Sequence, residues 1–369
     1  MAAARGTPSP GHSAKAAAAA GTGPRHMRTL RPPVPRPRIY DMYWWFAAER
    51  QRIFERRLAG DPPPWTSDRV LREFKFCNVF RAADRVSQYM IREVCYHGEP
   101  CTPADRLFQI TAFRTFSRPA TWRTVRGILG RYPLLDDLAA GSFTRALDAA
   151  RASNGGLYTG AFILCATRAY GHAAKHLNHA AMLAHMFLQD SLASQLMDAG
   201  SLREVYDLLR GYPLMGDFMA YQTAIDLNYS DLLTFGENDF TQPGPGALRG
   251  IRKVFEDPGD YTPAEIIHWM TDRQEQEFTR LGLPFAGLLG RPLHAIDCQN
   301  LFCETDKYCR EAAPELASAR TRIKARFAPS AEPLRLFFPP RWGINGPAEA
   351  SRAPAPQPRS AAAWQPALF

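Results

Sequence analysis

Two short apolar helices joined by a tight turn limit the fold of this chain more than any other feature. The stretch from Ser201 to Phe240 places apolar residues at helical spacing before Gly211 and again after Gly216. Between the two runs, residues 212–216 read Tyr-Pro-Leu-Met-Gly, which is typical of a turn because proline and glycine interrupt helices. A loop rich in glycine and acidic residues follows. The stretch therefore predicts a helical hairpin on which the rest of the chain packs.

The positive charge of the chain is concentrated at its ends. The 369 residues carry a formal net charge of +9, but residues 1–40 hold seven Lys or Arg and no acid, and residues 341–369 hold three Arg and one Glu. The remaining residues are close to neutral, which excludes a body that binds nucleic acid through overall charge alone. A DNA groove would have to be a local basic patch.

The composition also predicts the domain organisation. Residues 1–38 and 341–369 contain few large apolar side chains, so both are expected to be disordered tails around a folded body at 39–340. Seven irregularly spaced cysteines, no membrane-length apolar run and no signal-peptide core predict a reduced, intracellular protein with no membrane partner. An organellar transit peptide is the alternative for the Arg-rich N-terminus in a eukaryotic host.

The apolar pattern predicts an all-α body. Helical spacing recurs over residues 40–58 and 261–281, and residues 102–152 are expected to form three helices. A further apolar helix is expected after the glycine-rich residues 155–160. No convincing alternating pattern of strands occurs, and no G-x-x-x-x-G-K-[ST] motif is present, which excludes a P-loop kinase in these residues at the level of motif.

A basic stretch, Ser67 to Tyr96, precedes the hairpin. Its apolar residues form one stripe and predict a helix that also carries arginines. Interleaved basic, aromatic and amide side chains can line a groove for a nucleic-acid strand, whereas a solvated helix face with Arg–Asp pairs is the alternative. The polar residues of interest are Arg69, Arg72, Lys75, Asn78, Arg81, Asp84, Arg85, Gln88 and Arg92.

Two further polar groups are candidates for chemistry. Glu237 and Asp239 lie two residues apart in the loop after the hairpin, where they could divide the roles of base and electrostatic stabiliser, or Asp239 could simply cap a turn. His172, His176 and His179 share one helix face, but no glutamate completes an H-E-x-x-H motif. A polar helix face is the preferred interpretation there, so neither a metal nor a cofactor is expected.

The hairpin resembles the helix-hairpin-helix of the DNA glycosylase superfamily. In that motif, backbone N–H groups at a helix start hold a DNA phosphate, and a carboxylate further on faces an extruded nucleotide. Gly216 would then contact phosphate, and Asp239 or Glu237 falls near the place of the aspartate. This chain departs from the motif at Leu214, which replaces a glycine, at Asp217, an anion beside the phosphate position, and at Phe218, where lyase-type glycosylases carry lysine. An ordinary α-hairpin in a helical core is the alternative.

Two longer signatures resemble one family. Residues 76–89, FCNVFRAADRVSQY, and residues 297–308, DCQNLFCETDKY, are similar to the N-terminal and C-terminal signatures of the helical domain attached to phage 5-hydroxymethyluracil DNA kinases. That family includes the α-glutamyl/putrescinyl-thymine pyrophosphorylases. The resemblance spans about residues 40–340 and implies an all-helical, glycosylase-like domain that acts on thymine-derived bases in DNA.

The resemblance also implies a reaction, in which an amine replaces pyrophosphate on the 5-methylene of the base. The partners would be DNA, a separate base kinase and a small amine or amino acid. Such a transferase needs cations for pyrophosphate and a carboxylate for the amine. The residues expected to act are Arg81, Arg85 and Lys307 on phosphate, Asp239 and then Glu237 as the carboxylate, with Asn78, Gln88, Gly216, Asn300, Glu304 and Asp84 as further contacts.

Two other functions remain open from the sequence. One is a non-catalytic module that binds DNA or clamps a base, and the other is a glycosylase that recognises a modified base through Asp239. The proposed reaction requires three elements to meet around one cavity with an acid near it: the arginine-bearing early helix, the Pro/Gly turn and a late polar helix. Polar residues of that late helix recur at helical spacing, at Asp297, Asn300, Glu304, Lys307 and Tyr308.

Overall fold

The computed structural model describes residues 30–160, 167–316, 323, 325–328 and 335–346. The all-α prediction is confirmed over these residues, which include two very short strands, β1 (Val34–Pro35) and β2 (Phe255–Asp257), paired antiparallel. Residues 161–166, where part of the helix after Gly160 was expected, lie outside the described residues, as do 1–29 and 347–369. The α-helices are α1 (Pro37–Ala59), α2 (Arg69–Glu73), α3 (Arg85–Met90), α4 (Pro103–Phe116), α5 (Pro119–Leu129), α6 (Leu135–Ala139), α7 (Ser142–Asn154), α8 (Lys175–Ala184), α9 (Leu192–Asp198), α10 (Leu202–Arg210), α11 (Asp217–Asn228), α12 (Pro245–Val254), α13 (Pro263–Arg280) and α14 (Ala295–Ala312).

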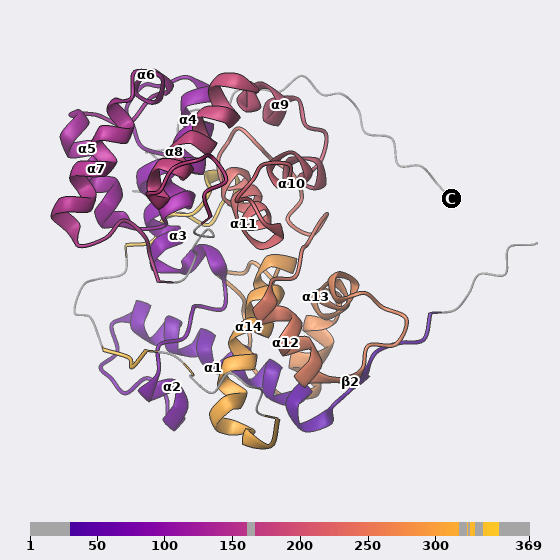
Figure 1. The fold of residues 1–369 in the computed structure, drawn as a ribbon. Coiled ribbons are helices and arrows are strands. Elements are labelled where there is room, and N and C mark those ends of the chain that lie inside the picture. The colour runs from indigo at the N-terminus through magenta and orange to yellow at the C-terminus, as the bar shows by residue number, and fades with distance from the viewer. Residues whose placement is uncertain (1–29, 161–166, 317–322, 324, 329–334, 347–369) are drawn as a thin grey trace, which may run out of the picture.

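The helices form two groups. The first two described α-helices, α1 and α2, lie in the same group as the last three, α12 to α14 (Figure 1). Figure 1 shows α4 to α10 gathered in one group and α1, α2, α12, α13 and α14 in the other, with α3 and α11 near the middle. Buried apolar residues from both groups belong to one continuous core. Among the residues described, no helix combines the length and apolar character needed to cross a bilayer.

Helix α14 is the centre of the second group, and α12 lies close against it. The close approach depends on Gly246 and Gly250, which are one turn apart on α12. A Cβ at Gly246 would overlap the Cys303 side chain, and one at Gly250 would overlap the carbonyl of Phe302. The two glycines therefore let the helix backbones approach more closely than any larger residue would allow.

The predicted hairpin is present, with α10 ending before Gly211 and α11 beginning after Gly216. Leu214 adopts φ +73°, the left-handed conformation that a glycine takes without cost. The leucine that replaces glycine in the helix-hairpin-helix pattern therefore occupies a backbone conformation that glycine would favour. Whether the hairpin is a DNA-binding helix-hairpin-helix stays a prediction.

The early basic stretch is not the single helix that its apolar stripe predicted. It divides into α2, the 3-10 helix η1 (Arg81–Ala83), α3 and the π-helix η2 (Ile91–Cys95), with non-helical backbone over 75–80. The reason is tertiary: backbone N–H groups of this segment donate to carboxylates on α14 instead of to their own helix. These bonds hold the segment in an irregular path across α14.

Two other regions differ from the sequence expectation. Residues 102–152 form four helices rather than three, because Gly141 takes φ +73° and separates α6 from α7.

Near the other end of the chain, Phe337 and Phe338 are buried in the core. The guanidinium of Arg341, which falls in the segment expected to be a disordered tail, donates to the carbonyl oxygens of Asn228, Ser230 and Leu233. Residues 335–346 are thus packed on the body.

Candidate active site

A buried carboxyl at the start of α14 is the centre of the candidate site. Asp297 occupies the third helical position, where its Oδ2 accepts the backbone N–H of His294 at 3.1 Å. Its Oδ1 accepts the backbone N–H of Arg81 at 2.8 Å. Burial raises the pKa of Asp297 to about 7, although both backbone hydrogen bonds favour the ionised form. A carboxyl of this kind can exchange a proton near neutral pH.

A second carboxylate, Glu237, lies beside Asp297 and is paired with an arginine. Oε1 of Glu237 is 2.6 Å from Nη2 of Arg291, and both side chains are largely buried. The negative charge of Glu237 adds to the rise in the pKa of Asp297. Burial lowers the pKa of His294, and the charge of Glu237 partly opposes that effect. The Arg291 guanidinium also lies 3.8 Å from the centre of the Trp342 ring. The site therefore combines the acids Asp297 and Glu237 with the Arg291 guanidinium, which contacts both Glu237 and Trp342.

Arg81 lies next to these acids, but much of its hydrogen-bonding capacity is used by the protein. Its Nε donates to Gln222 Oε1 at 2.7 Å, and its Nη2 is 2.7 Å from Asp226 Oδ1. Its guanidinium is 5.6 Å from the ring centre of Tyr229, the C-cap residue of α11. Nη1 is buried and has no hydrogen-bond partner in the described part of the chain. The phosphate-binding role of Arg81 stays a prediction.

Other predicted residues form a separate group two helical turns along α14. Glu304 is buried and accepts the backbone N–H of Cys77 at 2.9 Å. Lys307 Nζ lies 2.7 Å from Glu304 Oε1 and 3.1 Å from Cys303 Sγ. Burial lowers the pKa of Lys307, but the Glu304 carboxylate outweighs that effect and keeps the pKa above its ordinary value. Lys307 is therefore a charged group, and Asn300 lies half-buried one turn before Glu304.

The remaining residues of the early segment hold the fold together or face solvent. The Asn78 side chain accepts from Arg50 and donates to the Ala83 carbonyl at 2.6 Å, while its own N–H donates to Asp84 at 2.8 Å. Gln88 binds both backbone groups of Phe337. Arg85 is exposed. Arg69, Arg72 and Lys75 of the same segment are exposed as well.

The hairpin and the second acid of the loop lie outside the buried cluster. Gly216 is exposed and precedes α11, and the neighbouring Asp217 is paired with Arg210 and accepts from the Tyr206 hydroxyl at 3.2 Å. Asp239 is exposed, and its Oδ2 accepts the N–H of Gly236 at 3.0 Å. Asp239 thus closes a turn, which was the alternative considered for it. Its catalytic role stays a prediction.

The three histidines at helical spacing have different surroundings. His176 Nε2 is 2.6 Å from Asp148 Oδ1, His179 Nδ1 is 2.8 Å from the Tyr158 hydroxyl, and His172 is exposed. Among the described residues, no group of three or more His, Cys, Asp or Glu side chains could hold a metal ion.

Sequence reasoning found part of the buried cluster and missed the rest. It named Glu237 and Arg81, which the structure brings to the same place, and it included Asp297 in the C-terminal family signature, but it proposed no catalytic role for Asp297 and singled out neither Arg291 nor His294. One signal was available: His294 and Asp297 have the spacing of a capping box at the start of a polar helix. No local signal marks Arg291 or the distant Trp342, because only the fold brings them together.

A cavity lies along residues 274–292, and Asp297, Glu237, Arg291 and His294 are not among the residues that line it. It has a volume of about 640 Å³, and its lining includes Phe285, Gly290 and Pro292, the last two flanking Arg291 in sequence. The Phe285 ring stacks on Phe278 and on Phe80, the residue before Arg81, at centroid distances of 4.1 and 6.1 Å. The cavity is thus large enough for a nucleobase and lies next to the loop that carries the site's arginine.

With this geometry established, comparison with known sequences identifies the family. The sequence profile described as "5-hmdU DNA kinase, helical domain" matches residues 37–318, so the chain belongs to that family. A curated relative, the 5-hmdU DNA kinase of Bacillus phage SP10, is 28% identical over 307 residues, which cover 79% of this chain and 48% of the relative. The chain therefore spans about half the length of that protein. No solved structure matches the chain.

Proposed function

We propose that this protein takes part in the hypermodification of thymine bases in DNA by joining an amine to the 5-methylene of the base. In this reaction the bond from the methylene carbon to the pyrophosphate oxygen breaks and a carbon–nitrogen bond forms. The amine loses a proton and pyrophosphate leaves. Family membership and the phage relative, named for a kinase acting on 5-hydroxymethyluracil DNA, support the choice of substrate.

The arrangement of Asp297, Glu237 and Arg291 is the observation that carries this proposal. The carboxyl of Asp297, with a pKa of about 7, takes the proton that the attacking amine loses. Arg291 stabilises the charge that develops on the departing pyrophosphate, and Glu237, 2.6 Å away, orients its guanidinium. The extruded base is placed in the cavity along residues 274–292, whose lining includes Gly290 and Pro292, the sequence neighbours of Arg291. Arg85 and Lys307 remain proposed contacts to phosphate outside this cluster.

The kinase step that would precede this reaction needs a phosphate-binding site of its own. No P-loop motif occurs in the 369 residues. We therefore assign phosphorylation of the hydroxymethyl group to a separate kinase or kinase domain. A small amine or amino acid is the second substrate.

The experiment is incubation of the protein with DNA that carries 5-hydroxymethyluracil or its pyrophosphorylated form, with and without a panel of amines. Mass spectrometry of the nucleosides measures the product. A mass increase that requires both pyrophosphate and amine supports transfer, whereas release of free base identifies a glycosylase, and a gel shift without chemistry identifies a binding module.

Variants assign the reaction to the site. Asp297→Asn and Arg291→Gln are each expected to lower product formation by a factor of a hundred or more, a magnitude typical of general-base and charge-stabilising groups. Asp207→Asn, on the exposed face of α10, is the control and should leave the rate unchanged. Full activity in both site variants would contradict the assignment.

A further inference from the structure

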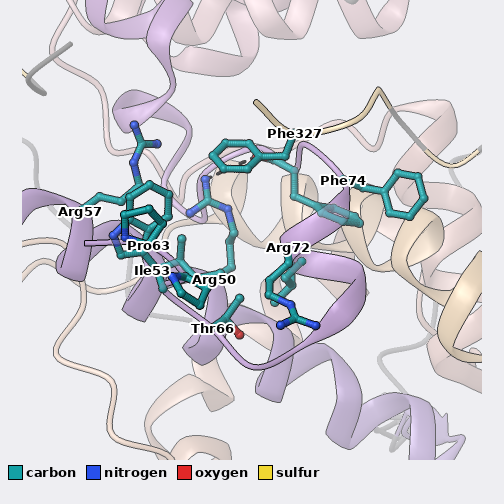
Figure 2. Close-up of a pocket in the computed structure, with 12 residues that line it drawn as sticks. Arg50, Ile53, Arg57, Pro63, Thr66, Arg72, Phe74 and Phe327 are labelled. Carbon is teal, nitrogen blue, oxygen red and sulfur yellow. Dashed lines mark hydrogen bonds between the residues drawn. The ribbon is translucent and has the colours of Figure 1, made fainter. Parts of the chain in front are cut away.

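A second, smaller pocket lies between the C-terminal half of α1, α2 and the loop that joins them. Figure 2 shows the residues that line it, and its volume is about 220 Å³. Three arginines reach it, Arg50, Arg57 and Arg72, and aromatic side chains including Trp65 and Phe327 form its walls. None of these residues belongs to the cluster around Asp297.

Arg50, which lines this pocket, has a donor that the described residues leave unused. Its Nη2 donates to the Asn78 side chain and, at 3.4 Å, to the Phe76 carbonyl oxygen. Its Nη1 is buried and finds no hydrogen-bond partner in the part of the chain that the structure describes. Burial lowers the pKa of Arg50, and the charges of Asp84 and Glu304 oppose that effect. A buried guanidinium N–H without an acceptor is costly unless a ligand supplies one.

The other two arginines add charge that the protein does not neutralise by direct pairing. Arg57 lies over the Trp65 ring, 5.1 Å from its centre, and Arg72 is exposed. Among the described residues, no carboxylate forms an ion pair with Arg50, Arg57 or Arg72. The pKa of Arg57 is lowered by burial and then by the charge of Arg85, which places a fourth arginine near the pocket. Such a cluster attracts an anion with several oxygens.

The aromatic wall is built by a distant segment of the chain. Residues near 326 pair with the end of α2: Lys75 donates to the Ala325 carbonyl at 2.9 Å, and Phe327 donates to the Glu73 carbonyl at 2.8 Å. This pairing holds the Phe327 ring 6.2 Å from the Trp65 ring, at an interplanar angle of 73°. A flat, apolar ligand can therefore rest against Phe327 or Trp65 beside the arginines.

We propose that this pocket binds a nucleotide, with its phosphate on the arginines and its base against the aromatic side chains. Guanidinium groups bind phosphate oxygens in pairs, and aromatic rings stack on bases of any sequence. The volume of about 220 Å³ suits one nucleotide rather than a duplex. The nucleotide is either free in solution or the phosphorylated end of a DNA strand. The inference does not depend on the transfer reaction.

Isothermal titration calorimetry with the full chain tests the proposal. The probes are thymidine diphosphate, thymidine, inorganic pyrophosphate and a short oligothymidylate with a 5′-phosphate. Thymidine diphosphate or the phosphorylated oligonucleotide is expected to bind at least tenfold more tightly than thymidine or pyrophosphate, because only these two carry both recognised groups. The tighter of the two identifies the source of the nucleotide.

Variants separate the two halves of the pocket. The double variant Arg57→Gln with Arg72→Gln should weaken binding of the better probe by tenfold or more, and Phe327→Ala should weaken it by about fivefold while leaving the weak pyrophosphate binding unchanged. Arg252→Gln, which removes an exposed arginine from α12, is the control for net charge. Thermal unfolding confirms that each variant is folded. Equal binding by the double variant and the control, or equal affinity for thymidine and thymidine diphosphate, would overturn the proposal.

Discussion

The carboxylate of Asp226 lies between the guanidinium groups of Arg81 and Arg114, and all three side chains are almost completely buried. Asp226 is on α11, Arg114 on α4, and Arg81 in the segment that crosses α14. One carboxylate therefore joins the two groups of helices and fixes the segment from which the Arg81 N–H reaches Asp297. Because two buried cations share this anion, its loss would leave both without their counter-charge.

Asp226→Asn is accordingly expected to destabilise the protein by about 3–5 kcal/mol, the usual cost of breaking a buried ion pair from one side. Urea unfolding monitored by circular dichroism measures the effect. The matched control is Asp207→Asn, whose partner Arg203 is exposed, and it should change the free energy of unfolding by less than about 1 kcal/mol. Similar values for the two variants would show that the buried network contributes little.

The pKa of Asp297 predicts a pH dependence of stability. Its ordinary value is 3.8 and its value in the folded protein is about 7, so between these limits the folded state holds a proton that the unfolded state has released. This contribution to the free energy of unfolding is fully present below about pH 4 and is lost as the pH rises through 7. Asp297→Asn, which cannot ionise, should lose less stability than the wild type between pH 5 and 8 in urea titrations. Parallel pH profiles would contradict the raised pKa.

Glu237 and Asp239 should differ sharply despite lying two residues apart. Glu237→Gln removes a buried partner of Arg291 and is expected to lower product formation at least tenfold, since the guanidinium loses its orientation. Asp239→Asn alters an exposed turn and should change the rate less than twofold. Mass spectrometry measures the rate of product formation for both variants on the same DNA substrate. A larger loss of rate in Asp239→Asn than in Glu237→Gln would mean that Asp239 is the acting carboxylate.

A side chain added to α12 where it contacts α14 should destabilise the protein. Gly250→Ala places a Cβ against the Phe302 carbonyl and is expected to destabilise the protein by about 2 kcal/mol or more, because backbone on both helices must move. Gly127→Ala, on α5 with nothing within 4 Å of the new Cβ, is the control and should be stabilising by about 0.5–1 kcal/mol. Thermal and urea unfolding give both values, and a neutral Gly250→Ala would mean that the two helices can separate.

The positions of the helices could largely be predicted from the sequence. Helices α1, α10, α11 and α13 begin and end close to the predicted residues, because capping residues, prolines and glycines act within a few positions along the chain. Besides the extra helix over residues 102–152, the main exception is the segment over residues 75–85, where an apolar stripe predicted a helix. Carboxylates of Asp297 and Glu304, more than two hundred residues away, take its backbone N–H groups instead.

The site could be predicted only in part, for a related reason. By itself the sequence determined the helical class of the fold, the hairpin and the family signatures, since these depend on local spacing and on residue type. Only the tertiary structure decided that Glu237 pairs with Arg291, that Asp239 turns to solvent and that Asp297 is buried. Pairing and burial depend on which distant side chains displace water, and no local pattern encodes that.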